Sequence, residues 1–551
     1  MKLEHLRKIR KFLVWLFMMT MIIYPLYMKQ GFVHLATAKK EYFYVVCACL
    51  LIPSLVLSLW IYLFENDRKV KAIKPISTDW FVLFYGLALV ISTCSSSYQD
   101  TALSGYSGWY MGLTTQLFFL FTYYCVSRAY NFDNDWLFML FGASFVVFIL
   151  CVFARFHVAP FNLYSGRDED FWNEYIPTLG QKNWYACFLI IVYPTELAYF
   201  LIRKEKKQDA LLIPLLVVST MAAVMQDSDS VYVGMLFVLL FLFVMFVHNL
   251  AEATRYFTML SIIFISMQVL GVIQIIFEEN MVALSDMVTL CQGTFMRLAC
   301  VAVLLIWAIL LLLSREKKAG KISLSEEKEE RFFYIFKRIL LVFAALTIIT
   351  LIILIIMVTN LSDTYDFGWM EESKYFMFDD YWGTWRGMNW TASVKAYGGF
   401  NFWQKLFGVG PDCYYPYMNA NFPEFTARWS SAICNAHNEF LTALIDTGIV
   451  GAICYYGIFV SLILLTKKHW KEKPMLLVLC TGVIGFFFNN LFSFMNIIST
   501  PLLFCICGCM ASIIRADTLP DKGKGDRTKK ETKKAKNVKS QVNGKKRGKR
   551  R

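Results

Sequence analysis

The sequence predicts an all-α integral membrane protein that crosses the bilayer many times, and three observations support this class. Hydrophobic residues make up 57% of the 551-residue chain and charged residues only 17%, whereas soluble domains average about 45–50% and about 25%. The mean hydropathy is +0.48. The apolar residues also fall in long uninterrupted runs, and a membrane-spanning helix needs about 20 such residues.

We predict about 14 spanning helices, each from one such run. The first run follows several basic residues but has no small-residue cleavage site, so we expect it to be retained as a helix. The approximate ranges are 12–28, 43–64, 79–96, 109–127, 135–156, 183–202, 210–225, 231–248, 257–277, 290–313, 339–360, 438–466, 474–492 and 497–514.

The Lys and Arg residues between the runs predict the orientation, because cytoplasmic loops carry an excess of them. With the N-terminus inside, the outer loops at 95–108, 226–230 and 278–287 contain no Lys or Arg, whereas the loop at 29–42 contains three Lys. We therefore expect both termini to be cytoplasmic. The basic cytoplasmic segments would be 68–74, 203–207, 314–321, 467–473 and the C-terminal tail.

The C-terminal tail carries most of the net charge of +14. Residues 515–551 contain 16 Lys and Arg against 4 Asp and Glu, with almost no apolar residues to drive folding. We therefore divide the chain into a membrane domain, 1–515, and a disordered basic cytoplasmic tail, 516–551. The tail is expected to lie on anionic membrane lipids. Nucleic-acid binding is not expected, because no nucleic-acid-binding motif accompanies the charge.

The largest segment outside the predicted spans, about 360–437, is expected to be a single extracytoplasmic loop. It contains GTWRGMNW at 383–390 and LFGVGP at 406–411, and it ends in NAHNEFL at 435–441. DTGIVG follows at 446–451. Two cysteines of this loop, Cys413 and Cys434, could pair as a disulfide.

The order of these motifs resembles the membrane domain of the O-antigen ligase and polymerase family. An Arg followed by Trp, a Gly-x-Gly turn, and a His-Asn-x-aromatic-Leu helix start with a later Gly-x-x-Gly recur there in this order. Upstream, Gly180, Asn183 and Ala186 are similar to the family pattern Gly-x-x-Asn-x-x-Ala, so the likeness spans roughly 167–455. Asp229 departs from the pattern, because many relatives have an Arg there.

The resemblance implies a glycosyltransferase of the bacterial inner membrane that moves a glycan from undecaprenyl diphosphate to a hydroxyl of another glycan or cell-envelope acceptor. It also implies inversion at the anomeric carbon, without metal or cofactor. Arg carries a permanent positive charge that suits phosphate oxygens, and His can accept a proton near neutral pH. Arg386 is therefore the candidate for binding the diphosphate, and His437 for the general base.

Both residues have an ordinary structural alternative. His437 could merely cap or flank the helix that begins near Asn438, and Arg386 could be a surface residue stacked on Trp385 or Trp390.

Five further residues are candidates for binding the diphosphate or the glycan. Arg167 could instead pair with the acidic residues beside it, and Arg297 could reach from its helix to the interface. Arg297 is also the candidate replacement for the cation missing at position 229. Asn183 and Asn438 belong to the motifs, and Trp390 could stack on a sugar or join an interfacial aromatic belt.

Two other classes of function remain open at this stage. A flippase for lipid-linked oligosaccharides would carry its polar residues on facing helices near the bilayer midplane, whereas here they concentrate in outer loops. A non-catalytic scaffold of an envelope-assembly complex is the third hypothesis, besides the glycosyltransferase and the flippase. The motifs do not distinguish a polymerase from a ligase.

Overall fold

The computed structural model describes residues 3–64, 74–203, 206–282, 285–323, 325–429 and 432–516. Within these residues the chain is almost entirely helical. The exception is one antiparallel pair of short strands, β1 (Tyr175–Ile176) and β2 (Gly180–Gln181). The predicted basic tail, 516–551, lies outside the described residues apart from its first residue.

Eleven helical segments of the described chain are long and apolar enough to cross a membrane, which confirms the all-α polytopic class. They are α1 (Leu3–Ile23), α2 and α3 (Leu35–Val46 and Ile52–Phe64, continuous through a π-helical turn at Cys47–Leu51), α5 (Ser77–Ser95), α8 (Asn134–Ala154), α10 (Lys182–Ile202), α11 (Lys206–Met225), α12 (Asp229–Phe246), α13 (Leu250–Ile276), α15 (Thr294–Lys318), α16 (Glu326–Leu361) and α21 (Glu439–His469).

Three shorter helices occupy the remaining predicted runs. They are α7 (Leu113–Ala129), α22 (Met475–Asn489) and α23 (Thr500–Arg515). Since they have 17, 15 and 16 residues, below the usual spanning length, the number of about 14 crossings stays a prediction.

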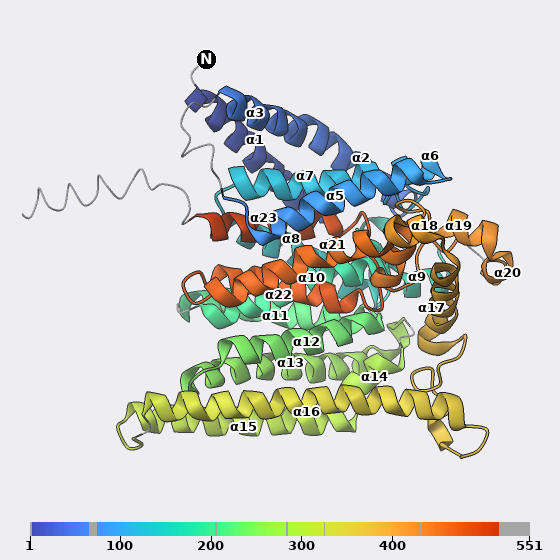
Figure 1. Cartoon of the computed structure of the whole chain (residues 1–551). Helices are drawn as coiled ribbons and strands as arrows, with labels where there is room; N and C mark the ends of the chain where they lie inside the picture. Colours follow the sequence, from blue (N-terminus) through green and yellow to red (C-terminus); the bar gives the residue numbers. More distant parts are fainter. Residues whose placement is uncertain are drawn as a thin grey trace, which may run out of the picture.

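The long helices lie side by side, and the short helices outside the bundle gather at one of its ends (Figure 1). We call this the loop-bearing end. About half of the segment predicted as one outer loop, 360–437, is helical. The short helices at the loop-bearing end are α6 (Gln99–Ser104), α9 (Glu169–Glu174), α14 (Asp286–Gln292), α17 (Trp382–Gly399), α18 (Phe402–Phe407), α19 (Tyr414–Asn421) and α20 (Pro423–Thr426). The described chain also has 3-10 turns at Tyr24–Leu26, Pro160–Asn162, Glu278–Asn280 and Gly368–Met370.

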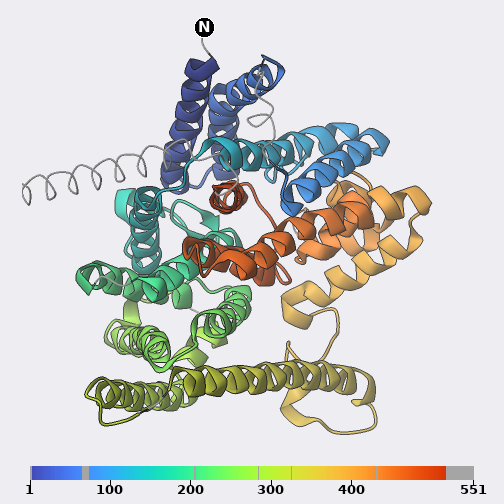
Figure 2. The same ribbon diagram turned by 60° about the vertical axis from the view of Figure 1, so that its left-hand side comes forward.

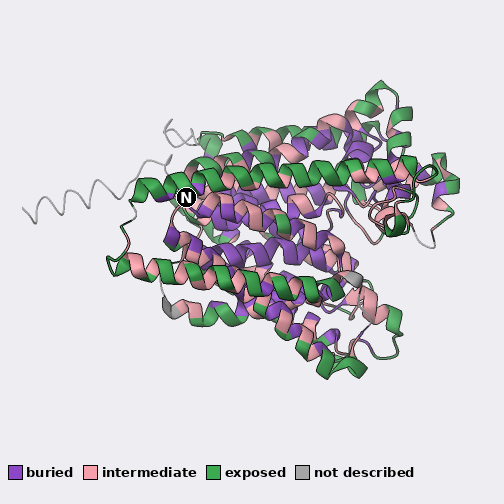
Figure 3. Cartoon of the chain, turned by 90° about the horizontal axis from the view of Figure 1, so that it is seen from below, coloured by how far each residue is buried: buried purple, intermediate pink, exposed green. Residues whose placement is uncertain are grey.

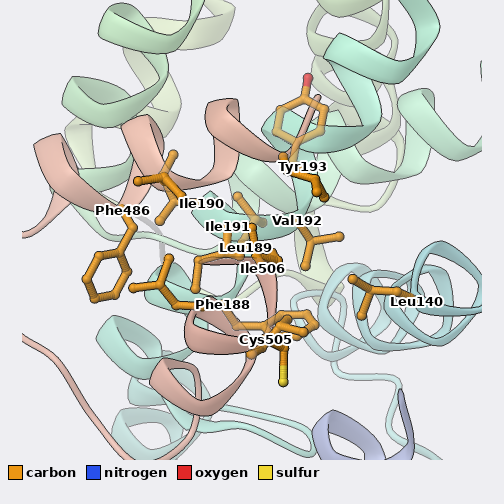
Figure 4. Packing of buried hydrophobic residues seen from close by; sticks show 14 of the residues in the cluster. Leu140, Phe188, Leu189, Ile190, Ile191, Val192, Tyr193, Phe486, Cys505 and Ile506 are labelled. Carbon is orange, nitrogen blue, oxygen red and sulfur yellow. The ribbon is translucent and has the colours of Figure 1, made fainter. Parts of the chain in front are cut away.

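Helix α10 lies at the centre of the bundle, and almost all of its residues are buried. Its side chains pack with α8, α22 and α23, as Figure 4 shows for Leu140, Phe486 and Ile506. Small residues let α22 approach α10 closely, because a Cβ at Gly482 would lie 2.4 Å from the Ile191 carbonyl oxygen. Close backbone contact of this kind is how helices associate in lipid, which offers little hydrophobic driving force.

Helix α16 is the opposite extreme and lies at the edge of the molecule (Figure 2). The most apolar stretch of α16 contains no buried residue, and the outer helices carry most of the exposed surface in Figure 3. An apolar helix with few protein neighbours is stable only in lipid, so α16 is suited to face the bilayer.

The backbone at a kink in α21 requires glycine at two positions of the motifs. Gly448 has left-handed backbone angles (φ 65°, ψ −175°) inside the helix, and the turn that contains Gly408 packs against it. A Cβ on Gly448 would lie 2.3 Å from the carbonyl carbon of Leu406, and one on Gly408 would lie 2.4 Å from that of Asp446. The Gly410 N–H completes the junction by donating to the Asp446 carbonyl oxygen at 2.9 Å. These motif positions are therefore required by backbone packing.

The disulfide that the sequence allowed between Cys413 and Cys434 is not formed. Both are buried free thiols. The Cys413 thiol lies 3.9 Å from the Ser96 hydroxyl, and the Cys434 thiol lies 3.8 Å from the Ala432 carbonyl oxygen.

Candidate active site

Arg386 lies in the first turns of α17, at the loop-bearing end. Its Nε donates to the Phe492 carbonyl oxygen at 3.0 Å, and its Nη1 donates to the Gly383 carbonyl oxygen. Left-handed φ angles from Gly383 to Trp385 shape this turn. Two backbone carbonyls therefore orient the guanidinium, and in the described chain it makes no cation–π contact with Trp385 or Trp390.

His437 directly precedes α21 and has a left-handed backbone (φ 49°). Its N–H donates to the Asn435 side-chain oxygen at 3.0 Å, and its ring lies edge-on to Phe494, with centroids 5.1 Å apart. Burial, with a smaller contribution from the Arg386 charge, lowers the pKa of His437 to about 3. The imidazole is therefore neutral at physiological pH and can accept a proton.

The segment between α22 and α23 joins the two residues. Its Phe492 carbonyl holds Arg386, and its Phe494 ring packs on His437. The predicted spans at 474–492 and 497–514 left only four residues between them, which is wrong, because α22 ends at Asn489 and α23 begins at Thr500. The paired asparagines 489 and 490 were the available signal for this helix end.

Asp229 and Tyr375 lie beside Arg386. The Tyr375 hydroxyl donates to the Asp229 carboxylate at 3.1 Å. Burial lowers the pKa of Arg386, and the negative charge of Asp229 opposes that effect. The residue that stands where many relatives have a cation is thus next to Arg386, and it brings a negative charge there.

Asn438 has a structural role in α21. Its side-chain oxygen accepts from the Leu441 N–H at 3.0 Å, which caps the helix. Its side-chain nitrogen donates to the Leu491 carbonyl oxygen at 3.0 Å. His437 is therefore not the cap, and Asn438 fixes it relative to the segment that holds Arg386.

Asn183 lies at the start of α10 and accepts a hydrogen bond from the Ser228 hydroxyl at 2.8 Å. The next residue, Trp184, begins a row of edge-to-face rings that leads to His437. Trp184 and Trp109 are 5.9 Å apart between centroids, and Trp109 and Phe494 are 5.0 Å apart. Asn183 thus joins the start of α10 to the turn that precedes Asp229.

The other candidates are less closely associated with Arg386 and His437. Trp390 packs on Phe492, with centroids 5.8 Å apart. Arg167 is exposed, and its guanidinium lies 4.6 Å from the centre of the Phe171 ring. Arg297 is in the first turn of α15, where its Nε donates to the Gln292 carbonyl oxygen at 3.1 Å. In the described chain, neither Arg167 nor Arg297 contacts Arg386 or His437.

The fold and this site define a polytopic helical membrane protein with an arginine and a neutral histidine brought together at one end of the bundle. Residues 281–456 match the family model for O-antigen ligase, which supports membership of the O-antigen ligase and polymerase family, as the motif order predicts. The matched residues include Arg297, Arg386 and His437. No curated protein matches the chain.

The family match supports glycan transfer of the O-antigen ligase or polymerase type at a membrane. With the apolar helices, it also supports a multi-pass protein of the bacterial inner membrane. The part of the predicted family-like core from Arg167 to Asp229 precedes the matched residues.

Proposed function

We propose that this chain is an inverting glycosyltransferase that transfers a polyprenyl-diphosphate-linked glycan to a sugar hydroxyl without a metal. The family match supports the general reaction type, and the donor, the stereochemistry and the metal independence are our inference. The loop-bearing end would face the outside of the cytoplasmic membrane. The membrane domain, 1–515, would have both termini in the cytoplasm.

The neighbourhood of Arg386 and His437 carries this proposal. They come from separate segments about 50 residues apart in the sequence, yet the charge of Arg386 acts on His437. A diphosphate would bind to Arg386, whose Nη2 makes no hydrogen bond to the part of the chain described here. Charge-assisted bonds from a guanidinium to phosphate are among the strongest in proteins.

In the proposed reaction, the acceptor hydroxyl oxygen attacks the anomeric carbon from the side opposite the diphosphate. The bond between that carbon and the diphosphate oxygen breaks, and the diphosphate leaves with the electron pair. The hydroxyl proton passes to the neutral His437. Donor binding assists this step, because the diphosphate offsets the positive field of Arg386 and thereby raises the pKa of His437.

The neighbouring residues would position this pair. Asn438 caps the helix after His437, and Asn183 and Trp390 contact segments that border the pair. We do not assign Arg167 to the reacting centre, because it is exposed and held over Phe171.

A reconstituted reaction tests the proposal. Purified full-length protein in proteoliposomes would receive the lipid-linked oligosaccharide of the source organism, with wild type, Arg386→Ala and His437→Ala compared. Release of polyprenyl diphosphate that both substitutions abolish would support the two roles. A ladder of longer lipid-linked chains would identify a polymerase, and a single transfer to an added acceptor would identify a ligase. Movement of labelled lipid between leaflets without diphosphate release would refute the enzyme and indicate a flippase.

A further inference from the structure

A groove of about 820 Å³ lies between α13, α14 and α15, at the loop-bearing end (Figure 1). Its apolar lining includes Val272, Ile275 and Val288. Val272 and Ile275 also have large exposed fractions, so the groove is continuous with the surface that would face lipid. The groove does not include Arg386 or His437.

Two amide side chains that line this groove each have one polar atom without a hydrogen-bond partner in the described part of the chain. Gln274 is only 7% exposed, and the oxygen of its amide is buried without a partner. The side-chain nitrogen of Gln292 is likewise buried without a partner. Because an unpaired buried polar atom costs about 1–3 kcal/mol, the two atoms indicate a ligand that supplies both a donor and an acceptor.

Charge limits what that ligand can be. Arg297 also lines the groove, and its only hydrogen bond in the described chain is from Nε to the Gln292 carbonyl oxygen. An exposed carboxylate, Glu278, lies at the rim. Among the described side chains that line the groove, one cation and one carboxylate suit a singly charged phosphodiester better than a diphosphate.

We propose that this groove binds the headgroup of an anionic phospholipid that carries a phosphate and a free hydroxyl, as phosphatidylglycerol does. The phosphate would accept from Arg297 and from the Gln292 nitrogen, and the headgroup hydroxyl would donate to the Gln274 oxygen. The acyl chains would run along the apolar lining beside Val272 and Ile275. This site is separate from the proposed reacting centre and does not depend on the proposed function.

Photo-crosslinking tests the site directly. The full-length protein is reconstituted in phosphatidylcholine vesicles with a small fraction of phosphatidylglycerol bearing a photoreactive group near the headgroup, and crosslinked peptides are mapped by mass spectrometry. We expect labelling within residues 268–297 that excess unlabelled phosphatidylglycerol removes. Loss of a charge-assisted bond predicts that Arg297→Gln reduces this labelling by about tenfold.

Two further variants make the result specific. Gln274→Leu replaces an unpaired amide with an apolar side chain, so it should preserve folding and still reduce labelling. Arg167→Gln removes an exposed arginine from the same end of the bundle and should leave labelling unchanged.

Three results would overturn the proposal. They are equal labelling by a phosphatidylcholine probe, labelling that does not change in Arg297→Gln, and displacement by polyprenyl diphosphate but not by phosphatidylglycerol. Displacement by soluble glycerol phosphate would also count against it, because the apolar lining requires a lipid.

Discussion

The pH dependence of glycan transfer distinguishes a half-buried, neutral His437 from an ordinary surface histidine. A general base must be unprotonated, so kcat/KM falls as the pH drops through the pKa of the base in the free enzyme. Since burial and the Arg386 charge lower the pKa of His437 to about 3, the acid limb should lie far below its usual place. Both phosphates of the donor are esterified, so the donor does not titrate in the range of interest.

The two cases differ strongly at about pH 5. With a pKa of about 3, about 1% of His437 is protonated at that pH, whereas an unperturbed histidine would be about 97% protonated. The first case predicts that kcat/KM at about pH 5 is close to its neutral value, and the second predicts a loss of about 30-fold.

The assay is polyprenyl diphosphate release at a donor concentration below KM, measured across pH in proteoliposomes. An acid limb with an apparent pKa near 6.5 would refute the reasoning. NMR of ring-labelled histidine gives an independent reading, because the chain has only six histidines and the His437 signal is the one missing in His437→Asn. In Arg386→Gln the His437 signal should titrate at higher pH, since one cause of the lowered pKa is removed.

Three further substitutions test the surroundings of the site. Gly448→Ala should lower the free energy of unfolding by about 2 kcal/mol or more, because the new side chain is strained in a left-handed backbone and collides with the facing turn. The thermal unfolding midpoint should therefore fall. The control Gly398→Ala, whose Cβ would meet open space, should not lower it. Asp229→Asn removes a negative charge beside Arg386, so the donor should bind more tightly by about 1 kcal/mol and its KM should fall several-fold. An equal fall in KM in the exposed control Asp363→Asn would contradict this. Asn438→Ala should cost about 1 kcal/mol or more, because both the cap and the bond to the Leu491 carbonyl oxygen are lost. Asn438→Ser keeps the cap alone, so it should recover part of the lost unfolding midpoint; equal midpoints in the two variants would refute the capping role.

The apolar runs were sufficient to predict the class of fold, because in lipid an uninterrupted apolar stretch has few alternatives to a helix. Helix ends were harder. The run at 474–492 continues past Asn489 into Leu491 and Phe492, which are apolar but belong to the segment that holds Arg386. Hydropathy does not distinguish a helix residue from a loop residue with the same side chain.

The order of the motifs predicted the candidate site, and the packing in the structure then showed which motif residues have a structural role. Gly408 and Gly448 are explained by backbone contact, and Asn438 by helix capping. The contact of Asp229 with Tyr375 joins residues 146 positions apart, so no local pattern could show it. The same limit applies to Arg297, whose groove depends on how α13, α14 and α15 pack together.

The most direct test of the central claim separates donor binding from transfer. Binding of polyprenyl diphosphate and single-turnover transfer would be measured for wild type, Arg386→Gln and His437→Asn in the same proteoliposomes. The account predicts that Arg386→Gln weakens binding by about tenfold or more, the usual cost of a lost charge-assisted hydrogen bond. It also predicts that His437→Asn binds like wild type but does not transfer the glycan. Wild-type binding in Arg386→Gln, or wild-type transfer in His437→Asn, would contradict it.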